Sequence, residues 1–262
     1  MKTVASRILC CVVAILLPAV CVHAADVIDF DDYETGSVKG QPSGASKRWD
    51  SNLLQTQSPV WFVVDGQGPD GSKCLATTDT PSSADKWVRA DYFWDETAVS
   101  DNGFDAEGTY LLSMDICMPQ SALTNGYLDV YVNYMQGANS LNNKGTRVSY
   151  FIIHSNGNLQ FNDANYKRLT GFMYTSQGGS TGWHTVQFRM DYANGVYDIL
   201  VDGDEVVSDY AFYSAPETMS SFQGVRIRNC LDTLEGTQLL VDNISLTRLD
   251  RPKSYRTVIL YR

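Results

Sequence analysis

Histidine, basic charge and helical periodicity are all scarce in this chain, and each scarcity excludes a class of function. Three histidines occur among 262 residues, and one of them, His23, belongs to the leader described below. The two that remain, His154 and His184, are far apart in the sequence, and no His and Cys residues have the spacing of a zinc site. This composition argues against histidine-based metal chemistry.

Basic residues are outnumbered. The chain has 20 Lys and Arg residues against 30 Asp and Glu residues, a net charge of −10 at pH 7. The leader holds two of the basic residues, so 18 basic and 30 acidic residues remain after it, a net charge near −12. A strongly acidic protein is repelled by nucleic acid and by anionic membranes. We therefore expect neither as a main partner, whereas neutral glycans and carboxylate-built calcium sites are compatible with this charge.

The first 24 residues, the leader, have the pattern of a secretory signal peptide. Lys2 and Arg7 accompany an apolar run from Ile8 to Val22, and Val22-His23-Ala24 then forms a cleavage sequence. The alternative is a membrane anchor, which needs a span of ~20 apolar residues, longer than this run. We expect cleavage after Ala24, a mature protein that is secreted or held at the cell surface or in the periplasm, and no membrane insertion afterwards.

The cysteines do not form a disulfide framework. Three of the six lie in the leader, and the mature chain keeps three at wide spacing: Cys74, Cys117 and Cys230. One disulfide with a free thiol, or three buried thiols, would both fit this odd number. A chain of about 238 residues buries enough core to fold without a disulfide, so we predict one domain over residues 25–262.

Short segments of alternating apolar and polar residues predict an all-β protein. The three clearest segments are Tyr110–Ile116, Tyr127–Tyr134 and Thr185–Asp191. A strand over Gly195–Val201 follows the turn Tyr192–Gly195, where Asn-Gly favours a hairpin. The other predicted strands are Trp87–Trp94, Arg147–His154, Asn158–Phe161, Gly224–Arg228 and Gln238–Thr247, and the Gly- and Ser-rich segment Val38–Asp50 is a predicted loop. About ten strands without a helix predict a sandwich or a barrel.

One segment carries a more specific pattern. Gly182-Trp183-His184 begins a predicted strand, and a hairpin with Val201-Asp202-Gly203 at its turn follows. The segment resembles the laminin G-like domain, a concanavalin-like jelly roll of two antiparallel sheets. The resemblance covers about a tenth of the chain and implies the fold rather than the activity. In this context His184 is expected to be structural rather than catalytic.

The two ends of the predicted domain carry a second pattern. Phe30-Asp31-Asp32-Tyr33-Glu34-Thr35-Gly36 and Val241-Asp242-Asn243-Ile244-Ser245-Leu246 are similar to the opening and closing strands of bacterial carbohydrate-binding jelly rolls. This resemblance implies that the terminal strands pair and that their acidic residues hold a structural calcium ion. Calcium takes about six to eight oxygen ligands, and the matching positions are Glu34 and Asp242, with Asp32 as a third. The alternative is that these residues are solvated acids at strand ends.

Hydrolase patterns are weak or missing. Jelly-roll glycosidases that resemble this fold carry Glu-x-Asp-x-x-Glu on one strand, and no such string occurs in this sequence. Gly178–Gly182 reads Gly-x-Ser-x-Gly, but a nucleophile elbow needs a strand before it and a helix after it, whereas a strand follows here. A polysaccharide lyase acting on uronate-containing glycans is the stronger enzymatic alternative. Its candidate residues are Arg89, Arg147, Arg226 and Arg228 to neutralise the uronate, and His154 and Tyr131 to move the proton.

The strand Tyr127–Tyr134 carries the best candidate binding face. Alternation places Tyr127, Asp129, Tyr131 and Asn133 on one side of it, and it places Trp87 and Arg89 together on another strand. Aromatic rings cover the apolar faces of sugars, while Asp, Asn and Arg side chains meet hydroxyl groups. The alternative is a Tyr-decorated outer face without a ligand, because Tyr is favoured in strands anyway.

Together these patterns predict an exported, non-catalytic carbohydrate-binding protein built as a concanavalin-like jelly-roll sandwich. Its expected partner is a polysaccharide or a cell-surface glycan, and its expected roles are polysaccharide recognition or surface adhesion. Calcium is the expected structural cofactor. The lyase, and a structural surface protein without a sugar ligand, are the alternatives that the sequence leaves open.

Overall fold

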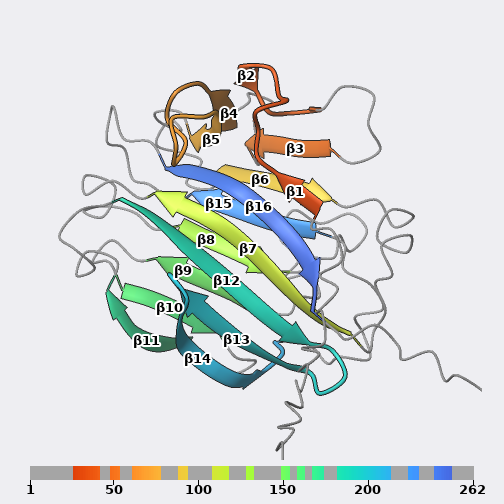
Figure 1. Ribbon diagram of the computed structural model, residues 1–262, viewed down its shortest axis with the longest axis vertical. Coiled ribbons are helices and arrows are strands. Elements are labelled where there is room, and N and C mark those ends of the chain that lie inside the picture. Colours follow the sequence, from red (N-terminus) through yellow and green to blue (C-terminus); the bar gives the residue numbers. More distant parts are fainter. Residues whose placement is uncertain are drawn as a thin grey trace, which may run out of the picture.

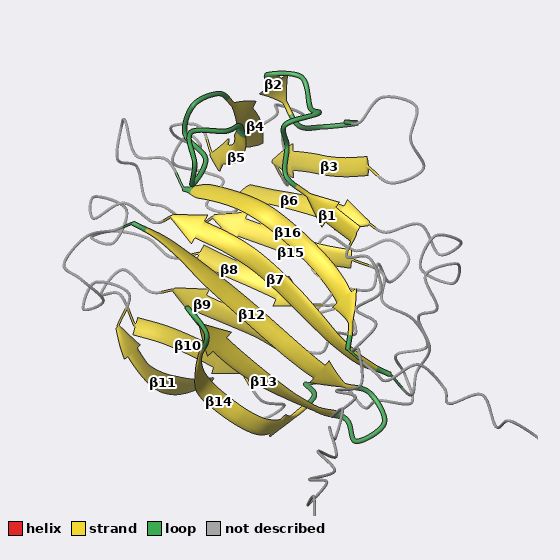
Figure 2. Ribbon diagram, viewed as in Figure 1, coloured by secondary structure: helices red, strands yellow, loops and turns green. Residues whose placement is uncertain are grey.

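The computed structural model describes residues 26–41, 48–53, 61–77, 88–93, 108–117, 128–132, 149–153, 158–162, 167–173, 182–213, 224–229 and 239–249. These residues form sixteen strands and no helix (Figures 1 and 2). No helix among them is therefore long and apolar enough to cross a bilayer. The strands are β1 (Asp26–Ile28), β2 (Gly36–Ser37), β3 (Arg48–Leu53), β4 (Trp61–Val64), β5 (Cys74–Thr77), β6 (Val88–Phe93), β7 (Thr109–Cys117), β8 (Leu128–Val132), β9 (Ser149–Ile153), β10 (Asn158–Asn162), β11 (Lys167–Met173), β12 (Trp183–Asp191), β13 (Val196–Val201), β14 (Asp204–Ala211), β15 (Gly224–Asn229) and β16 (Leu240–Arg248).

The strands form two sheets in which every pairing is antiparallel. The nine-stranded sheet has the order β14-β13-β12-β7-β16-β5-β4-β2, with β1 also paired to β16, and the seven-stranded sheet has the order β11-β10-β9-β8-β15-β6-β3. In Figure 1 the long strands β16, β7 and β12 of the larger sheet cross in front of β15, β8 and β9 of the smaller sheet. The arrangement is a two-layer sandwich.

One hydrophobic cluster fills the space between the sheets. It joins Leu112 and Phe188 of the nine-stranded sheet to Val130, Phe151 and Ile227 of the seven-stranded sheet. The rings of Phe151 and Phe188 stack from opposite sheets, with their centroids 5.2 Å apart. This packing confirms the prediction of an all-β sandwich of two antiparallel sheets.

The long central strands follow the alternation that the sequence predicted. Buried and half-buried side chains alternate along all nine residues of β7 and of β12. On β7 the core side carries Tyr110, Leu112, Met114 and Ile116, as predicted. A side chain on a strand points to one face or the other with a period of two, so the core positions also determine which residues face outward.

Both predicted hairpin turns are present. The turn between β12 and β13 passes through Asn194-Gly195, where Gly195 has a φ of 66°. The turn between β13 and β14 consists of Asp202 and Gly203, with φ values of 53° and 88°. Two consecutive residues with positive φ are typical of the tight turns that match the twist of a hairpin.

The terminal strands pair, as the resemblance implied, but the opening strand is β1, and the segment Phe30–Gly36 that carried the resemblance forms a turn region ending at the first residue of β2. β1 lies antiparallel to the second half of β16, with Val27 opposite Ser245. β5 pairs with the first half of β16 through Leu240 and Val241. Between these halves the ladder of β16 with β7 shifts register after Asp242, and the next residue, Asn243, has a φ of 49°.

The predicted loop Val38–Asp50 is wrong at its end, because Arg48–Leu53 forms the edge strand β3. Trp49 accounts for the difference: it is buried in the core and its ring lies 5.1 Å from that of Tyr92 on β6. Burial of one large ring stabilises the strand more than the Gly- and Ser-rich residues before it disfavour it. Trp61 of β4 also belongs to the core.

We predict that Phe188→Ala destabilises the domain by about 3–5 kcal/mol, because the change leaves a cavity between the two sheets. Val27→Ala is the matched control: its side chain is largely exposed, so the change should cost less than about 0.5 kcal/mol. Urea unfolding of the mature protein measures both values. Equal losses in the two variants would contradict the assignment of the core.

Candidate functional site

The outer face of the seven-stranded sheet is defined by what lies on its inner face. Ala90 of β6, Val130 of β8 and Ile227 of β15 are all buried in the core cluster. The residues on either side of them in each strand therefore occupy positions on the opposite, outer face. Residues 129 and 131 of β8, 226 and 228 of β15, and 89 and 91 of β6 are these outer positions.

The strand register aligns these outer positions in two rows that run across the strands. From β8 through β15 and β6 to β3, the rows are Tyr131–Arg226–Asp91–Asp50 and Asp129–Arg228–Arg89–Asn52. On the other side of β8, Tyr150 is opposite Tyr131 and Ile152 is opposite Asp129. Aromatic, basic and acidic residue types thus share one face over five neighbouring strands.

Among the side chains whose burial the structure describes, two polar ones on this outer face are buried. Arg226 is 5% exposed, and Gln160 of β10 is 9% exposed. Gln160 lies between the core residues Leu159 and Phe161, so it occupies the outer side of β10. Buried polar groups are costly unless they are hydrogen-bonded or paired. Side chains held in this way are positioned rather than freely mobile, which suits recognition of a ligand.

The structure brings together half of the predicted ligand-binding residues. Asp129 and Tyr131 lie on β8 and Arg89 lies on β6, all at outer positions of one sheet. The other three predicted residues lie outside the described residues: Tyr127, Asn133 and Trp87.

The sequence did not predict that Arg226 and Arg228 would lie between β8, which carries Asp129 and Tyr131, and β6, which carries Arg89. β15 follows β8 by more than ninety residues and is inserted between β8 and β6. The alternation within β15, where Val225 and Ile227 face the core, was the available signal that Arg226 and Arg228 lie on the outer face. Of the other candidates for a lyase, Arg147 and His154 lie outside the described residues.

A second polar region lies where β16 changes register. The Asp242 side chain is 1% exposed, although it lies on the nine-stranded sheet's side away from the core. One carboxylate oxygen, Oδ1, accepts a hydrogen bond from the backbone N–H of Asn243 at 2.8 Å, and Oδ2 lies 3.4 Å from the hydroxyl of Ser72. Gly68 packs against the side chains of Ser72 and Asp242, and a Cβ added to Gly68 would lie 3.0 Å from Asp242 Oδ2. The loop between β4 and β5 therefore closes over this carboxylate.

The pKa of Asp242 is raised to about 7, mainly by burial and also by the negative charges of Asp115 and Asp31. Hydrogen bonds from Asn243 and Ser72 act in the opposite direction. Within the described part of the chain, no Lys or Arg is among the groups that shift it. A buried carboxylate with two acidic neighbours can take up a proton or a cation. This is the electrostatic setting that a calcium ion would favour.

The predicted calcium ligands are only partly brought together. Asp32 and Glu34 are exposed, and the backbone N–H of Glu34 donates to Gln41 Oε1 at 2.8 Å. No described contact joins either residue to Asp242, whereas Asp31 is one of its electrostatic neighbours. Over the ranges that the structure describes, no three His, Cys, Asp or Glu residues form a metal-binding group. Calcium stays a prediction, with Asp31 rather than Asp32 or Glu34 beside Asp242.

A short chain of hydrogen bonds joins this region to the hairpin that carries the laminin G-like pattern. Asn243 Nδ2 donates to one carboxylate oxygen of Asp115 at 2.8 Å, and the hydroxyl of Thr185 donates to the other at 2.6 Å. The backbone N–H of Thr185 donates to Asp202 Oδ1 at 2.9 Å, and Asp202 Oδ2 lies 2.6 Å from His184 Nδ1. His184, 7% exposed, thus holds the β13–β14 turn.

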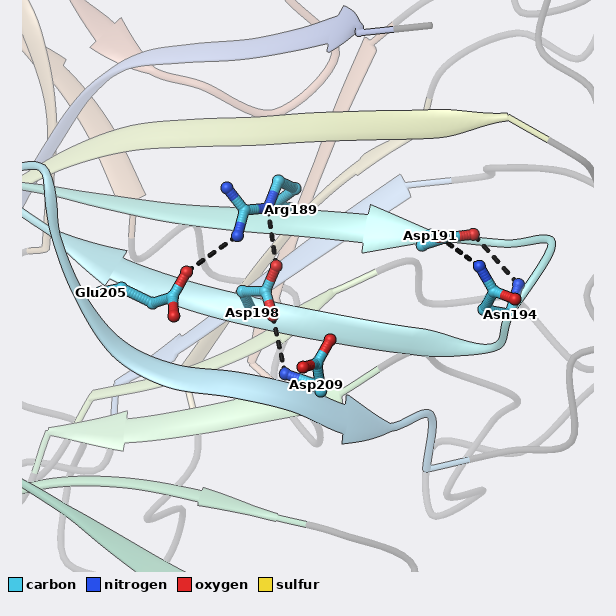
Figure 3. A network of polar contacts seen from close by, with 6 residues as sticks. All are labelled: Arg189, Asp191, Asn194, Asp198, Glu205 and Asp209. Atoms are coloured by element: carbon cyan, nitrogen blue, oxygen red, sulfur yellow. Dashed lines mark hydrogen bonds and ion pairs between the residues drawn. The ribbon is translucent and has the colours of Figure 1, made fainter.

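The edge of the nine-stranded sheet has its own polar network (Figure 3). Asp198 of β13 accepts a hydrogen bond from Arg189 Nε of β12 at 2.6 Å and another from the backbone N–H of Asp209 at 2.7 Å. Arg189 also donates to Glu205 Oε2 at 2.8 Å. Asp209 has a φ of 53°, and the β13–β14 register shifts between Tyr197 and Ile199. These contacts therefore satisfy a β-bulge, and they serve the edge strand rather than a ligand.

Cys74 and Cys117 are free thiols on β5 and β7. β16 lies between these strands, so their backbones are about 9.5 Å apart, beyond the ~7 Å that a disulfide spans. The pKa of the Cys74 thiol is raised to about 12, mainly by burial and also by the charges of Asp242 and Cys117. A disulfide between these two residues is excluded, and Cys230 lies outside the described residues.

The fold and its outer face define a jelly-roll-like β-sandwich domain that presents polar and aromatic residues on one sheet. A sialidase structure matches 86% of this chain with a TM-score of 0.52 and 11% identity, and the chain spans 18% of the length of that protein. The structure of a conserved carbohydrate esterase from the Shiga toxin-encoding bacteriophage phi24B matches 86% of this chain and 100% of its own, with a TM-score of 0.49 and 13% identity. The binding domain of Paraclostridial Mosquitocidal Protein 1 matches 83% of this chain and 48% of its own, with a TM-score of 0.46 and 13% identity.

At these identities the likeness concerns the fold alone, and the sialidase match supports the β-sandwich. No protein-family model matches the sequence, and no curated protein sequence matches it. The jelly-roll part of the resemblance found in the sequence is therefore supported, whereas membership of the laminin G-like family is not shown.

We predict that the stability of the calcium-free domain falls as the pH rises from about 5 to 8. The folded state binds a proton at Asp242 with a pKa of about 7, whereas the unfolded chain releases that proton near the ordinary value of 3.8. Between these values the folded state holds more protons, so raising the pH favours unfolding. Asp242→Asn should remove this pH dependence, and Asp32→Asn, an exposed control, should keep it. Thermal unfolding in a chelator measures the three profiles, and parallel profiles for all three proteins would contradict the assignment.

Proposed function

We propose that this protein binds carbohydrate without catalysis through the outer face of its seven-stranded sheet. The observation that carries the proposal is the register of β8, β15 and β6. It places Tyr131, Asp129 and Arg89 on one face, although the last is about forty residues from the first two in the sequence. Export to the cell surface, the periplasm or the medium, as the leader predicts, would give such a face access to polysaccharide.

The chemistry of this face fits a sugar. Tyrosine rings cover the apolar faces of a sugar ring, and their hydroxyls hydrogen-bond at the rim. Asp, Asn, Gln and Arg supply the donors and acceptors that sugar hydroxyls need, and the face contains all four residue types. A few polar groups held in fixed positions determine orientation and specificity in such sites.

A lyase is the second candidate function, and one observation favours it. Tyr131 is directly opposite Arg226, which is 5% exposed, so a proton-accepting residue type and a fixed positive charge are neighbours on one face. A lyase also needs a group placed to move the proton at the reacting carbon. At the described outer positions only Tyr131 and its register partner Tyr150 are of a type suited to that task, and we take binding without catalysis as the simpler proposal.

We predict that Tyr131→Ala weakens glycan binding about fivefold or more with the fold intact, because an aromatic residue that anchors a ligand contributes above ~1 kcal/mol to a binding site. Gln187→Ala, on the outer face of the other sheet, should leave affinity unchanged. Glycan-array screening followed by calorimetry on the mature protein, with far-ultraviolet circular dichroism as the folding check, measures this.

Two results would contradict the proposal. Absence of binding to any glycan, with and without calcium, would remove carbohydrate recognition and favour a structural surface protein. Growth of absorbance from an unsaturated sugar product on uronate polymers would show a lyase instead, and Tyr131→Ala should then abolish that growth.

We also propose that calcium binds at Asp242. Asp242 and Asp31 would supply carboxylate oxygens, backbone carbonyls would complete the site, and Glu34 and Asp32 stay as predicted further ligands. The ion would stabilise the junction of β16 with the loop between β4 and β5, and it would take no part in any reaction step.

A ligand that binds the folded state at about a hundred times its dissociation constant stabilises it by about 2.7 kcal/mol. We therefore expect millimolar calcium to raise the melting temperature of the wild-type protein relative to a chelator, and not that of Asp242→Asn. Magnesium at equal concentration is the control, since its smaller octahedral shell fits such sites poorly. The same rise in both proteins, or none in the wild type, would contradict a calcium site at Asp242.

A further inference from the structure

Two arginine positions lie directly opposite each other on the proposed binding face. Arg228 of β15 is the register partner of Arg89 of β6. The chain neighbours of these arginines, Ile227 on β15 and Ala90 on β6, both face the core. Residues 228 and 89 therefore share the outer face. A third arginine, Arg226, precedes Arg228 by two residues on β15 and lies on the same face.

Like charges directly opposite each other destabilise an antiparallel strand pair. In the same row, Asp129 is opposite Arg228 on its other side, and Asn52 is opposite Arg89. One carboxylate therefore accompanies two guanidinium groups in this row. The row carries a net positive charge within a chain whose net charge is −10.

Two of the three acidic residues in these two rows lie in the row next to the arginine pair. There Asp91 is opposite both Arg226 and Asp50, so the two acids lie toward the edge strand β3. The face is thus divided into an arginine-rich part on β15 and β6 and an acidic part on β6 and β3. A ligand that carries an anionic group beside its hydroxyls would complement this division, because Asp129 is the one acidic residue in the row that holds Arg228 and Arg89.

We propose that the ligand is an acidic glycan whose uronate carboxylates bind at Arg89 and Arg228. This rests on the proposed carbohydrate-binding function and narrows its ligand class from glycans in general to carboxylate-bearing ones. Guanidinium groups stay charged at every accessible pH, and their planar donors match the two oxygens of a carboxylate. Local charge at contact distance outweighs the repulsion from the rest of the acidic chain, because salt screens exposed charges beyond ~8 Å at physiological ionic strength.

The test compares polymers that differ only in the carboxylate. Polygalacturonate, alginate and hyaluronan, each beside its carboxyl-reduced neutral form, are titrated into the mature protein at physiological salt. We expect at least one acidic polymer to bind about tenfold or more tightly than its reduced form, as for the loss of one charge-assisted interaction. Arg89→Gln and Arg228→Gln should each remove this preference, and Arg89→Lys should restore part of it.

The matched control removes an arginine from the other sheet. Arg189→Gln lowers the net charge by the same amount, but Arg189 belongs to the β13–β14 edge network, so the preference should persist. Far-ultraviolet circular dichroism and melting temperature verify that every variant is folded.

The other outcomes distinguish failure of the ligand class, of the arginine pair and of the proposed function itself. Equal binding of acidic and neutral polymers would overturn this inference and keep the proposed function. Binding of none of them, nor of any neutral glycan on an array, would overturn both. A preference that persists in Arg89→Gln and Arg228→Gln would overturn the assignment to this pair. Equal, arginine-dependent binding of a sulfated galactan would overturn selectivity for carboxylate over other oxyanions.

Discussion

Burial of one apolar row per strand between the two sheets is the constraint on which the rest of the structure depends. Leu112 and Phe188 from one sheet meet Val130 and Phe151 from the other, and the stacked phenyl rings fix the distance between the layers. Once the inward row of each strand is fixed, the outward row follows, because neighbouring side chains point to opposite faces. The polar face that we propose to bind a glycan is therefore a consequence of the core.

The sequence predicted the elements whose signal is local. β7 and β12 are half exposed, so their alternation is visible, and Asn194-Gly195 and Asp202-Gly203 mark their turns by chemistry alone. The sequence did not reveal β5, whose four residues are all buried, because a strand covered on both faces has no alternation to detect. It also missed β3, where burial of Trp49 outweighs a Gly- and Ser-rich approach.

The candidate site divides in the same way. That Asp129 and Tyr131 lie on one side of a strand follows from period two, and so does the pairing of Trp87 with Arg89 in the prediction. That β15 lies between β8 and β6 depends on contacts between residues more than ninety positions apart, and no local pattern encodes such pairing. The same limit applies to the calcium prediction: similarity of motif pointed to Glu34 and Asp242, with Asp32 as a third, whereas Asp31 and Asp115 are the acids whose charges raise the pKa of Asp242.

The polar network on β13 and β14 affects whether two copies of the domain can pair through their sheet edges. β14 is the outermost strand on its side of the nine-stranded sheet, and such an edge can template pairing with another chain. The backbone N–H of Asp209 donates to Asp198, so it is not available to another strand. The left-handed conformation of Asp209 interrupts the strand, and the exposed Asp204 and Glu205 add negative charge. A second copy would meet a bent and negatively charged edge, so the same contacts that satisfy the bulge also oppose edge-to-edge aggregation.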